Sequence, residues 1–315
     1  MQEVKELVDK LRDNVSKVIL GAEDTIDYIL TAILAGGHVL IEDQPGTGKT
    51  MLAKAFAKSM NGDFKRVQFT PDLLPSDVTG LSIYNQKEQQ FVLSKGPVFT
   101  NVLLADEINR ATPRTQSSLL EAMEERQVTI DGETMQLARP FLVIATENPL
   151  ETIGTFPLPE AQLDRFLMKL DMGKSTKEHE LSIIDCYIEN SPLNTLEAVC
   201  DMEQLIQAQE QISKVFVHQD IRKYIVDIVF ALRENSRVQA GVSTRGILAM
   251  VKSAQAYAAM SGRNYVEPDD VKKLAPRIFG HRIIAVGSQN QYKKNYDLVN
   301  EVVVTVKVPV ESWEK

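Results

Sequence analysis

A lysine and a threonine follow a short glycine-containing turn, and this combination is typical of a phosphate-binding loop. The turn lies between an apolar run, residues 39–41, and a predicted helix that opens with Lys49 and Thr50. Gly46 and Gly48 would let backbone N–H groups curl around an anion, and the helix N-terminus adds partial positive charge. Lys49 can then reach nucleotide phosphates, and the Thr50 hydroxyl can ligate Mg²⁺. The segment predicts a site for ATP and Mg²⁺.

The loop departs from the general pattern at one position. The pattern G-x-x-x-x-G-K-[ST] places glycine where this chain has Asp43, so only the second half, from Pro45 onward, is intact. A chance turn before a helix is the alternative, but strand and helix signals flank the segment in the correct order. The predicted nucleotide-binding residues of the loop are Gln44, Pro45, Gly46, Thr47, Gly48, Lys49 and Thr50.

Two acidic residues end a second apolar run, which spans residues 102–105. Asp106 and Glu107 should therefore emerge at the carboxyl edge of a parallel sheet, where open α/β sheets bind ligands. Alone, the pair is better explained as a cap or a solvated surface. Because the phosphate-binding loop precedes it, we interpret the pair as a Walker B motif. Asp106 would hold Mg²⁺ together with Thr50, and Glu107 would orient and deprotonate the attacking water.

A polar residue also follows the apolar run 141–145. Asn148 at that strand tip could position a water near a γ-phosphate. An asparagine before a proline is, however, more often a simple turn residue. The residue type alone leaves both interpretations open.

The elements around these residues include strands in the first part of the chain and helices in the second. Amphipathic helices are predicted over 4–18 and 26–35, before the phosphate-binding loop. Hairpins are predicted over 81–93, with a surface loop as the alternative, and over 127–137, where Asp131 and Gly132 form the turn. The later predicted helices cover residues 181–187, 202–215, 221–235, 245–260 and 268–277. The valine-rich run 302–306 favours a strand by its composition, whereas its position favours a helix.

The composition is that of a soluble globular protein. Of the 315 residues, 43% are hydrophobic and 25% are charged. The formal net charge of −8 argues against an extended nucleic-acid surface. The charged first twenty residues lack a signal-peptide core, and no apolar run reaches the length of a transmembrane segment. Cys186 and Cys200 lack metal-ligand spacing, and we expect buried thiols in a cytoplasmic protein.

Four segments in order resemble the AAA+ ATPases of the MoxR family. They are residues 44–50, 106–111, 145–149 and 157–166. The resemblance runs from about Val18 to beyond Arg282. It implies an α/β fold, in which a P-loop AAA+ module with a parallel sheet, flanking helices and β-hairpin inserts precedes an all-α helical lid. The implied division is a nucleotide-binding domain over 1–190, with a linking helix near 175–190, and a lid over 191–315.

The same resemblance assigns further site residues. Asn148 matches sensor 1, and Arg165 matches the arginine finger, which reaches the nucleotide of a neighbouring subunit. Arg245 lies in a segment that resembles sensor 2, although the family more often has proline where this chain has Thr244. Without the resemblance, Arg165 would be taken as an ion pair with Asp164 or Glu160, and Arg245 as a solvated charge. Whether Arg245 acts on its own nucleotide or on a neighbour's stays open.

The resemblance also extends the nucleotide site and assigns the hairpins. Val18, Ile19 and Met51 are expected to add to the nucleotide-binding residues. The hairpin over 81–93 matches the helix-2 insert, and the hairpin over 127–137 matches the pre-sensor-1 hairpin. Asp43 is tolerated among relatives.

The motifs, the composition and the resemblance leave three classes of function open. The leading one is an ATPase that remodels, matures or activates protein complexes as a ring, usually a hexamer, with a partner carrying a von Willebrand factor A domain. The second is the ATPase subunit of a metal-chelatase-like complex. The third is a nucleic-acid motor or loader, which the acidic balance disfavours. The protein client cannot be identified from the sequence.

Overall fold

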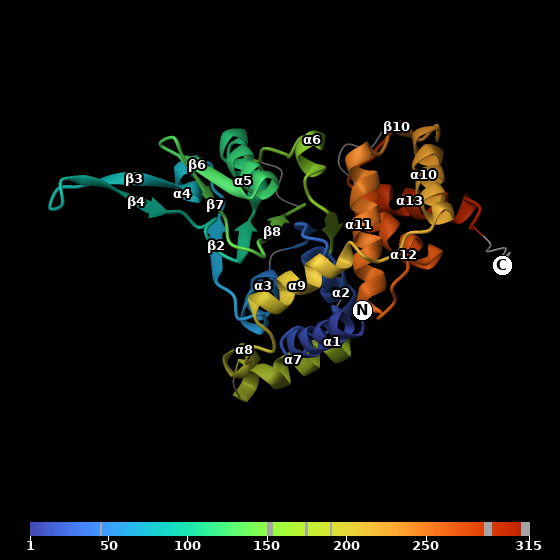
Figure 1. The fold of residues 1–315 in the computed structure, drawn as a ribbon, viewed down its shortest axis with the longest axis horizontal. Helices are drawn as coiled ribbons and strands as arrows, with labels where there is room; N and C mark the ends of the chain where they lie inside the picture. The colour runs from blue at the N-terminus through green and yellow to red at the C-terminus, as the bar shows by residue number, and fades with distance from the viewer. Residues whose placement is uncertain (45, 150–153, 174–175, 190, 287–291, 310–315) are drawn as a thin grey trace.

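A five-stranded parallel sheet forms the centre of the first part of the chain in the computed structural model (Figure 1). The structure describes residues 1–44, 46–149, 154–173, 176–189, 191–286 and 292–309. The strand order is β2-β5-β8-β1-β9. The strands are β1 (Val39–Glu42), β2 (Phe64–Gln68), β5 (Val102–Asp106), β8 (Leu142–Glu147) and β9 (Met168–Leu170). The apolar runs of the sequence therefore form the central strands, as predicted.

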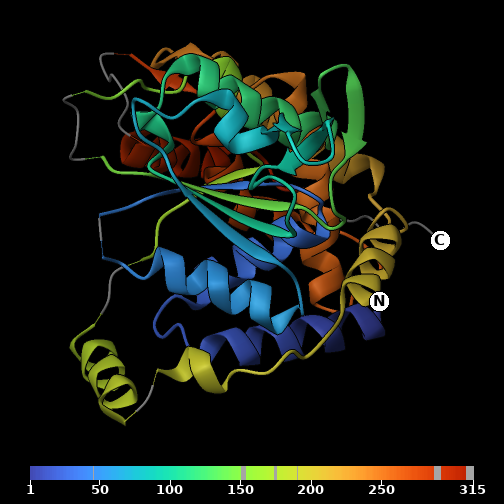
Figure 2. The ribbon, with the colours of Figure 1, turned by 90° about the vertical axis from the view of Figure 1, so that its left-hand side faces the viewer.

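Helices cover both faces of this sheet, because alternate residues of a strand point to opposite faces. Val102 and Leu104 belong to the same core as α1 (Gln2–Ser16), α2 (Glu23–Leu34) and α3 (Lys49–Ser59). Leu103 and Ala105 contribute instead to a second core on the other face. That core contains α4 (Pro75–Thr79) and α5 (Pro113–Glu125). Figure 2 shows the sheet between these two layers. Strands buried on both faces explain the near-continuous apolar sequences.

Both predicted hairpins are confirmed. One consists of β3 (Gly80–Asn85) and β4 (Gln90–Lys95), and it projects away from the sheet (Figure 1). The other consists of β6 (Gln127–Ile130) and β7 (Glu133–Gln136). Its turn residues, Asp131 and Gly132, have positive φ angles of 52° and 85°, as a two-residue hairpin turn requires. The projecting hairpin exposes the apolar side chains of Leu81, Ile83, Tyr84, Phe91 and Val92.

The later part of the chain is mainly helical. It contains α10 (Gln219–Arg233), α11 (Thr244–Met260), α12 (Pro268–Phe279) and α13 (Tyr292–Thr305). The valine-rich run lies in α13, so the strand preference of its composition is wrong there. Val302 and Val303 are buried against the other helices, and this packing outweighs the intrinsic β propensity of valine. A short antiparallel pair, β10 (Val238–Ala240) with β11 (Ile284–Ala285), adds two strands to the lid.

In the described part of the chain, five further helices lie between β5 and α10, two of them before β9 and three after it. They are η1 (Ile108–Arg110), α6 (Glu160–Leu163), α7 (Lys177–Glu189), α8 (Pro192–Thr195) and α9 (Met202–Ile212). No helix in the described ranges combines the length and the apolar character needed to cross a membrane.

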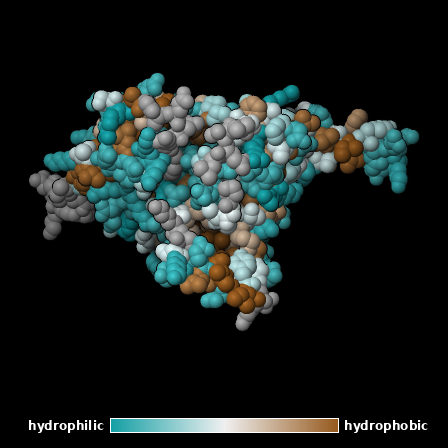
Figure 3. Space-filling view, turned by 180° about the vertical axis from the view of Figure 1, so that it is seen from behind, coloured by the Kyte–Doolittle hydropathy of each residue, from teal (hydrophilic) through white to brown (hydrophobic). Residues whose placement is uncertain are grey.

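The helix α7 leaves an apolar face exposed. Leu181, Ile184, Tyr187 and Ile188 each expose more than two fifths of their surface. Figure 3 shows hydrophobic residues on the lobe at the bottom of the molecule and on the projecting hairpin. Cys186 lies on this helix and is exposed, so the expectation of a buried thiol is wrong for Cys186 and confirmed for Cys200.

A buried histidine joins the sheet to α5 at the amino ends of the strands. His38 Nδ1 accepts a hydrogen bond from the Val143 backbone N–H at 2.9 Å, which leaves Nε2 as the donor to the Met123 carbonyl at 3.1 Å. Burial lowers the pKa of His38 well below its usual value, and the nearby Arg126 lowers it further. His38 is therefore neutral in the folded protein.

The neutral state of His38 predicts a pH dependence of stability. Unfolded histidine has a pKa of about 6.5, so the unfolded chain takes up a proton before the folded chain does. The contribution of His38 to the free energy of unfolding is thus present above about pH 6.5. It is lost as the pH falls towards the lowered pKa of His38 in the folded state. Each such histidine adds a slope of up to about 1.4 kcal/mol per pH unit. His281, which burial also keeps neutral, adds to the same dependence.

Denaturant unfolding between about pH 7.5 and 5.5 would test this linkage. We expect His38→Gln to reduce the loss of unfolding free energy on acidification, because glutamine has no proton to take up. His218→Gln is the matched control, since that side chain is 55% exposed. Equal pH slopes for the His38 variant and the wild type would contradict the assignment.

Candidate functional site

The phosphate-binding loop adopts the backbone that its glycines predict. Gly46 and Gly48 have φ angles of 84° and 88°, in the left-handed region that favours glycine. A Cβ atom at either position would have no neighbouring atom within 4 Å, so φ, and not space, requires glycine there. Gly48 caps α3, which begins at Lys49 as predicted. The Thr47 hydroxyl donates to the Gln44 carbonyl at 3.1 Å. Pro45 lies outside the described residues.

The Lys49 ammonium lies over this loop. It donates to the carbonyls of Asp43 and Gln44 at 2.6 and 3.1 Å. Burial lowers the pKa of Lys49, and the nearby carboxylates Asp43, Asp106 and Glu107 oppose that shift. The ammonium has three N–H donors, so one remains for a phosphate oxygen beside the two carbonyls.

Asp43 has a structural role at the position where the general pattern has glycine. One of its carboxylate oxygens accepts from the Gln44 N–H at 2.7 Å, and the other accepts from the Met172 N–H at 3.0 Å. Asp43 is not among the described residues with positive φ, so its backbone does not require glycine. The side chain fixes the loop to the segment that follows β9.

A buried threonine joins the two acidic residues to the neighbouring strand. The Thr146 hydroxyl donates to Asp106 Oδ1 at 2.7 Å and accepts from the Glu107 backbone N–H at 2.8 Å. Glu107 has a left-handed backbone with a φ of 56°, which is uncommon for residues other than glycine and often marks a functional site. Thr146 thus holds Asp106 and Glu107 in place from β8.

Two side chains of β2 also contact these acids. Arg66 Nη2 pairs with Asp106 Oδ2 at 2.6 Å, and Gln68 Nε2 donates to Glu107 Oε2 at 2.7 Å. Arg110 Nε lies 3.1 Å from the same Glu107 oxygen. The sequence analysis did not identify Arg66, Gln68 or Thr146 as site residues. Arg66 and Gln68 are two positions apart and so share one face of a strand, which is the signal that could have indicated them.

Eight of the predicted site residues line one cavity of about 390 Å³ at the carboxyl edge of the sheet, whereas Gln44 and Thr47 are not in its described lining. Its lining residues are Gly46, Gly48, Lys49, Thr50, Met51, Arg66, Gln68, Asp106, Glu107, Thr146, Glu147 and Asn148. Asn148 is 6% exposed, and it lies at the tip of β8 as predicted. Val18 and Ile19 are buried in the core and do not line the described part of this cavity. Their role in nucleotide binding stays a prediction.

The donor set of the cavity fits Mg²⁺. The Thr50 hydroxyl and the Asp106 carboxylate are oxygen ligands, which this ion prefers. Mg²⁺ usually takes only one or two carboxylates from the protein and its remaining ligands from phosphates and water. Accordingly, the described residues contain no cluster of three or more His, Cys, Asp or Glu side chains arranged for a metal.

A buried ion cluster lies beside the cavity at the ends of three strands. Lys169 of β9 pairs with Glu42 of β1 and lies 3.4 Å from the Glu147 carboxylate of β8. Burial raises the pKa of Glu147, and Lys169 opposes that shift. Removing one member would leave a buried charge without its partner, which is strongly destabilising. The cluster therefore holds the strands that carry the phosphate-binding loop and Asn148 in register.

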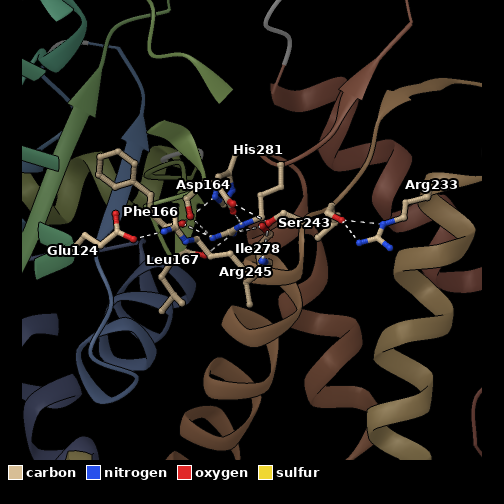
Figure 4. Close-up of polar contacts among 12 residues, drawn as sticks. Glu124, Asp164, Phe166, Leu167, Arg233, Ser243, Arg245, Ile278 and His281 are labelled. Carbon is tan, nitrogen blue, oxygen red and sulfur yellow. Dashed lines mark hydrogen bonds and ion pairs between the residues drawn. The ribbon is translucent and has the colours of Figure 1, made fainter. Parts of the chain in front are cut away.

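Arg165 and Arg245 lie at a different place from this cavity. Both line a second cavity of about 370 Å³, between α5, the segment before β9 and α11. Arg165 Nε lies 3.1 Å from Glu124 Oε2, and Arg245 pairs with Oε1 of the same carboxylate (Figure 4). Asp164 pairs with Arg282 at 2.6 Å instead of with Arg165. The structure therefore brings the two predicted arginines together but leaves them outside the lining of the phosphate-loop cavity.

Comparison with known proteins identifies both parts of the chain. Residues 38–168 match the family model "ATPase family associated with various cellular activities (AAA)", and residues 230–302 match the AAA lid domain. YeaC of Bacillus subtilis, whose function is uncharacterised, is 49% identical over 98% of this chain and 97% of its own length. Chaperone MoxR1 of Mycobacterium tuberculosis is 39% identical over 94% of this chain and 80% of its own length.

A solved structure shows the same fold. A crystal structure from Cytophaga hutchinsonii, described as a candidate ATPase, superposes with a TM-score of 0.89 at 38% identity. It covers 98% of this chain, and the match covers 96% of the solved chain.

The geometry of the loop predicts the effect of removing its ammonium. We expect Lys49→Ala to abolish nucleotide binding, because the charge of the β- and γ-phosphates loses its only lysine among the described lining residues. Titration with a fluorescent ATP analogue would measure the affinity. Lys54→Ala, one turn further along α3, is the matched control and should bind like the wild type. Near-wild-type affinity in the Lys49 variant would contradict the site.

Proposed function

Because the chain belongs to the MoxR family of AAA ATPases, we propose that it binds and hydrolyses ATP to remodel, mature or activate protein complexes. The observation that carries this proposal is the meeting of Lys49, Thr50, Asp106, Glu107 and Asn148 in one cavity. These residues come from the ends of two neighbouring strands, β5 and β8, and from the start of α3, where the backbone itself also favours an anion.

The residues of the cavity would divide the work of phosphoryl transfer to water. Glu107 would accept a proton from the attacking water, and Asn148 would help to orient that water. Lys49 and the backbone of the loop would hold the β- and γ-phosphates. Thr50 and Asp106 would hold Mg²⁺, which when bound neutralises part of the phosphate charge. Most of the catalysis would then be positioning and electrostatic stabilisation.

The two arginines would complete the site of a neighbouring subunit. Arg165 and Arg245 share the Glu124 carboxylate and line a cavity separate from the phosphate-binding loop. This separation supports action in trans for both. Each subunit would then offer a loop on one surface and the arginines on another, which is a head-to-tail contact that can close into a ring. We propose a hexamer on the resemblance to ring-forming AAA+ proteins.

The chaperone-like role is supported by the name of the relative MoxR1. The projecting hairpin over 80–95 and α7 both expose apolar side chains, which supports contacts with other proteins.

Four expectations stay predictions. They are a partner with a von Willebrand factor A domain, a protein client, a cytoplasmic location and the division into domains at residue 190. A chelatase-like ATPase subunit is the alternative. The net charge of −8 continues to argue against a nucleic-acid motor.

The proposed base is tested by a single change. We expect Glu107→Gln to retain ATP binding and to lower turnover by about 10²–10⁴-fold, because the amide cannot accept the proton. Steady-state phosphate release would give turnover, and the nucleotide titration would give affinity. Glu133→Gln on the exposed strand β7 is the control and should keep wild-type turnover. An unchanged rate in the Glu107 variant would place the base elsewhere.

The proposed trans finger is tested by mixing subunits. We expect Arg165→Ala to bind ATP normally and to lose turnover, by up to about 10³–10⁵-fold if it behaves like other arginine fingers. A mixture with the Lys49→Ala variant should regain part of the activity, because some junctions then pair an intact loop with an intact arginine.

Native mass spectrometry would establish that the two variants form mixed assemblies. Arg114→Ala, on the first turn of α5, serves as the control for loss of an exposed arginine. Mixed assemblies whose activity never exceeds that of the inactive parents would refute the trans assignment of Arg165.

A further inference from the structure

Glu124 is the centre of the arginine pair. It lies near the C-terminal end of α5, whereas Arg165 follows α6 and Arg245 lies in the first turn of α11. Each arginine contacts a different oxygen of the one carboxylate. Three segments far apart in the sequence therefore converge on Glu124, which no motif of the sequence indicates.

A rigid junction places the two arginines within reach of this carboxylate. Ser243 caps α11 by accepting from the Gly246 N–H at 3.2 Å, and its hydroxyl donates to Asp164 Oδ2 at 2.8 Å. The guanidinium of Arg282, only 2% exposed, pairs with the other oxygen of Asp164 at 2.6 Å. Arg165 directly follows Asp164, and Arg245 is two residues after Ser243. The segments that carry the two arginines are thus linked by a side-chain hydrogen bond.

The ends of the two arginine side chains are less constrained than their backbones. Glu124, Arg165 and Arg245 expose 33%, 31% and 46% of their side chains. Exposed ion pairs contribute only about 0–1 kcal/mol to stability, so folding does not depend strongly on this cluster. An arginine side chain, in contrast, carries about 2 kcal/mol of rotamer entropy, which must be lost when it binds an anion. A group that orders the arginines in advance reduces that loss.

The local charge balance indicates what the pair would bind. The described lining residues of this cavity include Arg126, Arg165, Arg245, Lys252 and Arg282. Its acidic residues are Asp164, which Arg282 already neutralises, and Glu124. Two guanidinium groups facing one carboxylate leave a net positive charge. A phosphoryl group presents two charged oxygens in the same way as a carboxylate, and guanidinium recognises both.

We propose that Glu124 is a positioning residue that holds Arg165 and Arg245 as one unit for the γ-phosphate of the neighbouring subunit's ATP. A guanidinium has five N–H donors, so each arginine can keep its bond to Glu124 while other donors contact the phosphate. The role is one of preorganisation, and Glu124 itself does not contact the nucleotide. This inference rests on the proposed trans action of the arginines.

Kinetics of Glu124→Gln would test the role. Glutamine replaces one carboxylate oxygen with an NH₂ donor, which would face one of the two arginines and could not accept from it. We expect kcat to fall by about 10–100-fold, the size of effect that a small misplacement produces, while KM for ATP stays close to that of the wild type. Glu124→Asp keeps the charge on a shorter side chain and should retain more activity than Glu124→Gln. The matched control is Glu133→Gln, which removes the same charge from an exposed residue of β7 and should have wild-type kcat.

The same mixing experiment locates the defect. Glu124→Gln subunits keep an intact loop, and Lys49→Ala subunits keep an intact arginine pair. Mixed assemblies should therefore be more active than the weighted mean of the two parents. In a variant that already carries Arg165→Ala and Arg245→Ala, adding Glu124→Gln should cause no further loss of turnover. The side chains that Glu124 positions are already absent there.

The outcomes separate this inference from the function on which it rests. If Arg165→Ala lowers turnover but Glu124→Gln, with an unchanged melting temperature, does not, the positioning role is wrong and the trans finger stands. If Glu124→Gln lowers kcat but mixing with Lys49→Ala subunits restores no activity, the effect of the substitution lies within its own subunit. That result would also refute the positioning role. If Arg165→Ala keeps wild-type turnover, the trans proposal and the role of Glu124 both fail.

Discussion

The hydrogen bonds of the Thr146 hydroxyl join the functional parts of the first domain. Thr146 is 1% exposed at the end of β8, and it contacts Asp106 and the Glu107 backbone at the end of β5. Because Asn148 directly follows β8, these bonds also fix its position relative to the acids. On its other side β8 pairs with β1, which leads into the phosphate-binding loop. The loop, the acids and Asn148 are therefore positioned by neighbouring strands of one sheet, and not by flexible segments.

A second network performs the same task for the arginines. Arg282 donates to the carbonyls of Asp164, Phe166 and Leu167, and it pairs with the Asp164 carboxylate. Its guanidinium is buried, so these bonds replace the water that it has lost. The Asp164–Ser243 bond extends the network to α11. Helices of the lid are thus attached to the end of the nucleotide-binding module at the position of Arg165, and the lid cannot move independently of that residue while the network is intact.

The sequence predicted those features that depend on short segments. The central strands, the glycine turn before Lys49 and the Asp131–Gly132 hairpin follow from local patterns and are confirmed. Thr146 and Glu124 were not identified, because their partners are set by strand register and by the approach of α11 from a distant part of the chain. The valine-rich run in α13 was ambiguous for the same reason, since tertiary burial decides its conformation. The proposed trans role of Arg245 depends on the contact between subunits, which local spacing does not describe.

The side-chain charges of the loop cavity support the proposed contribution of a neighbouring subunit. Its described lining contains the carboxylates of Asp106, Glu107 and Glu147 against the cations Lys49 and Arg66. Arg66 pairs with Asp106, and Glu147 lies beside Lys169. Among the described lining residues this leaves Lys49 as the cation for the phosphates, beside the Mg²⁺ that Thr50 and Asp106 would hold. The surface around Glu124 has the opposite imbalance. Electrostatics therefore favours an active site in which one subunit supplies the acids and the loop, and its neighbour supplies the arginines.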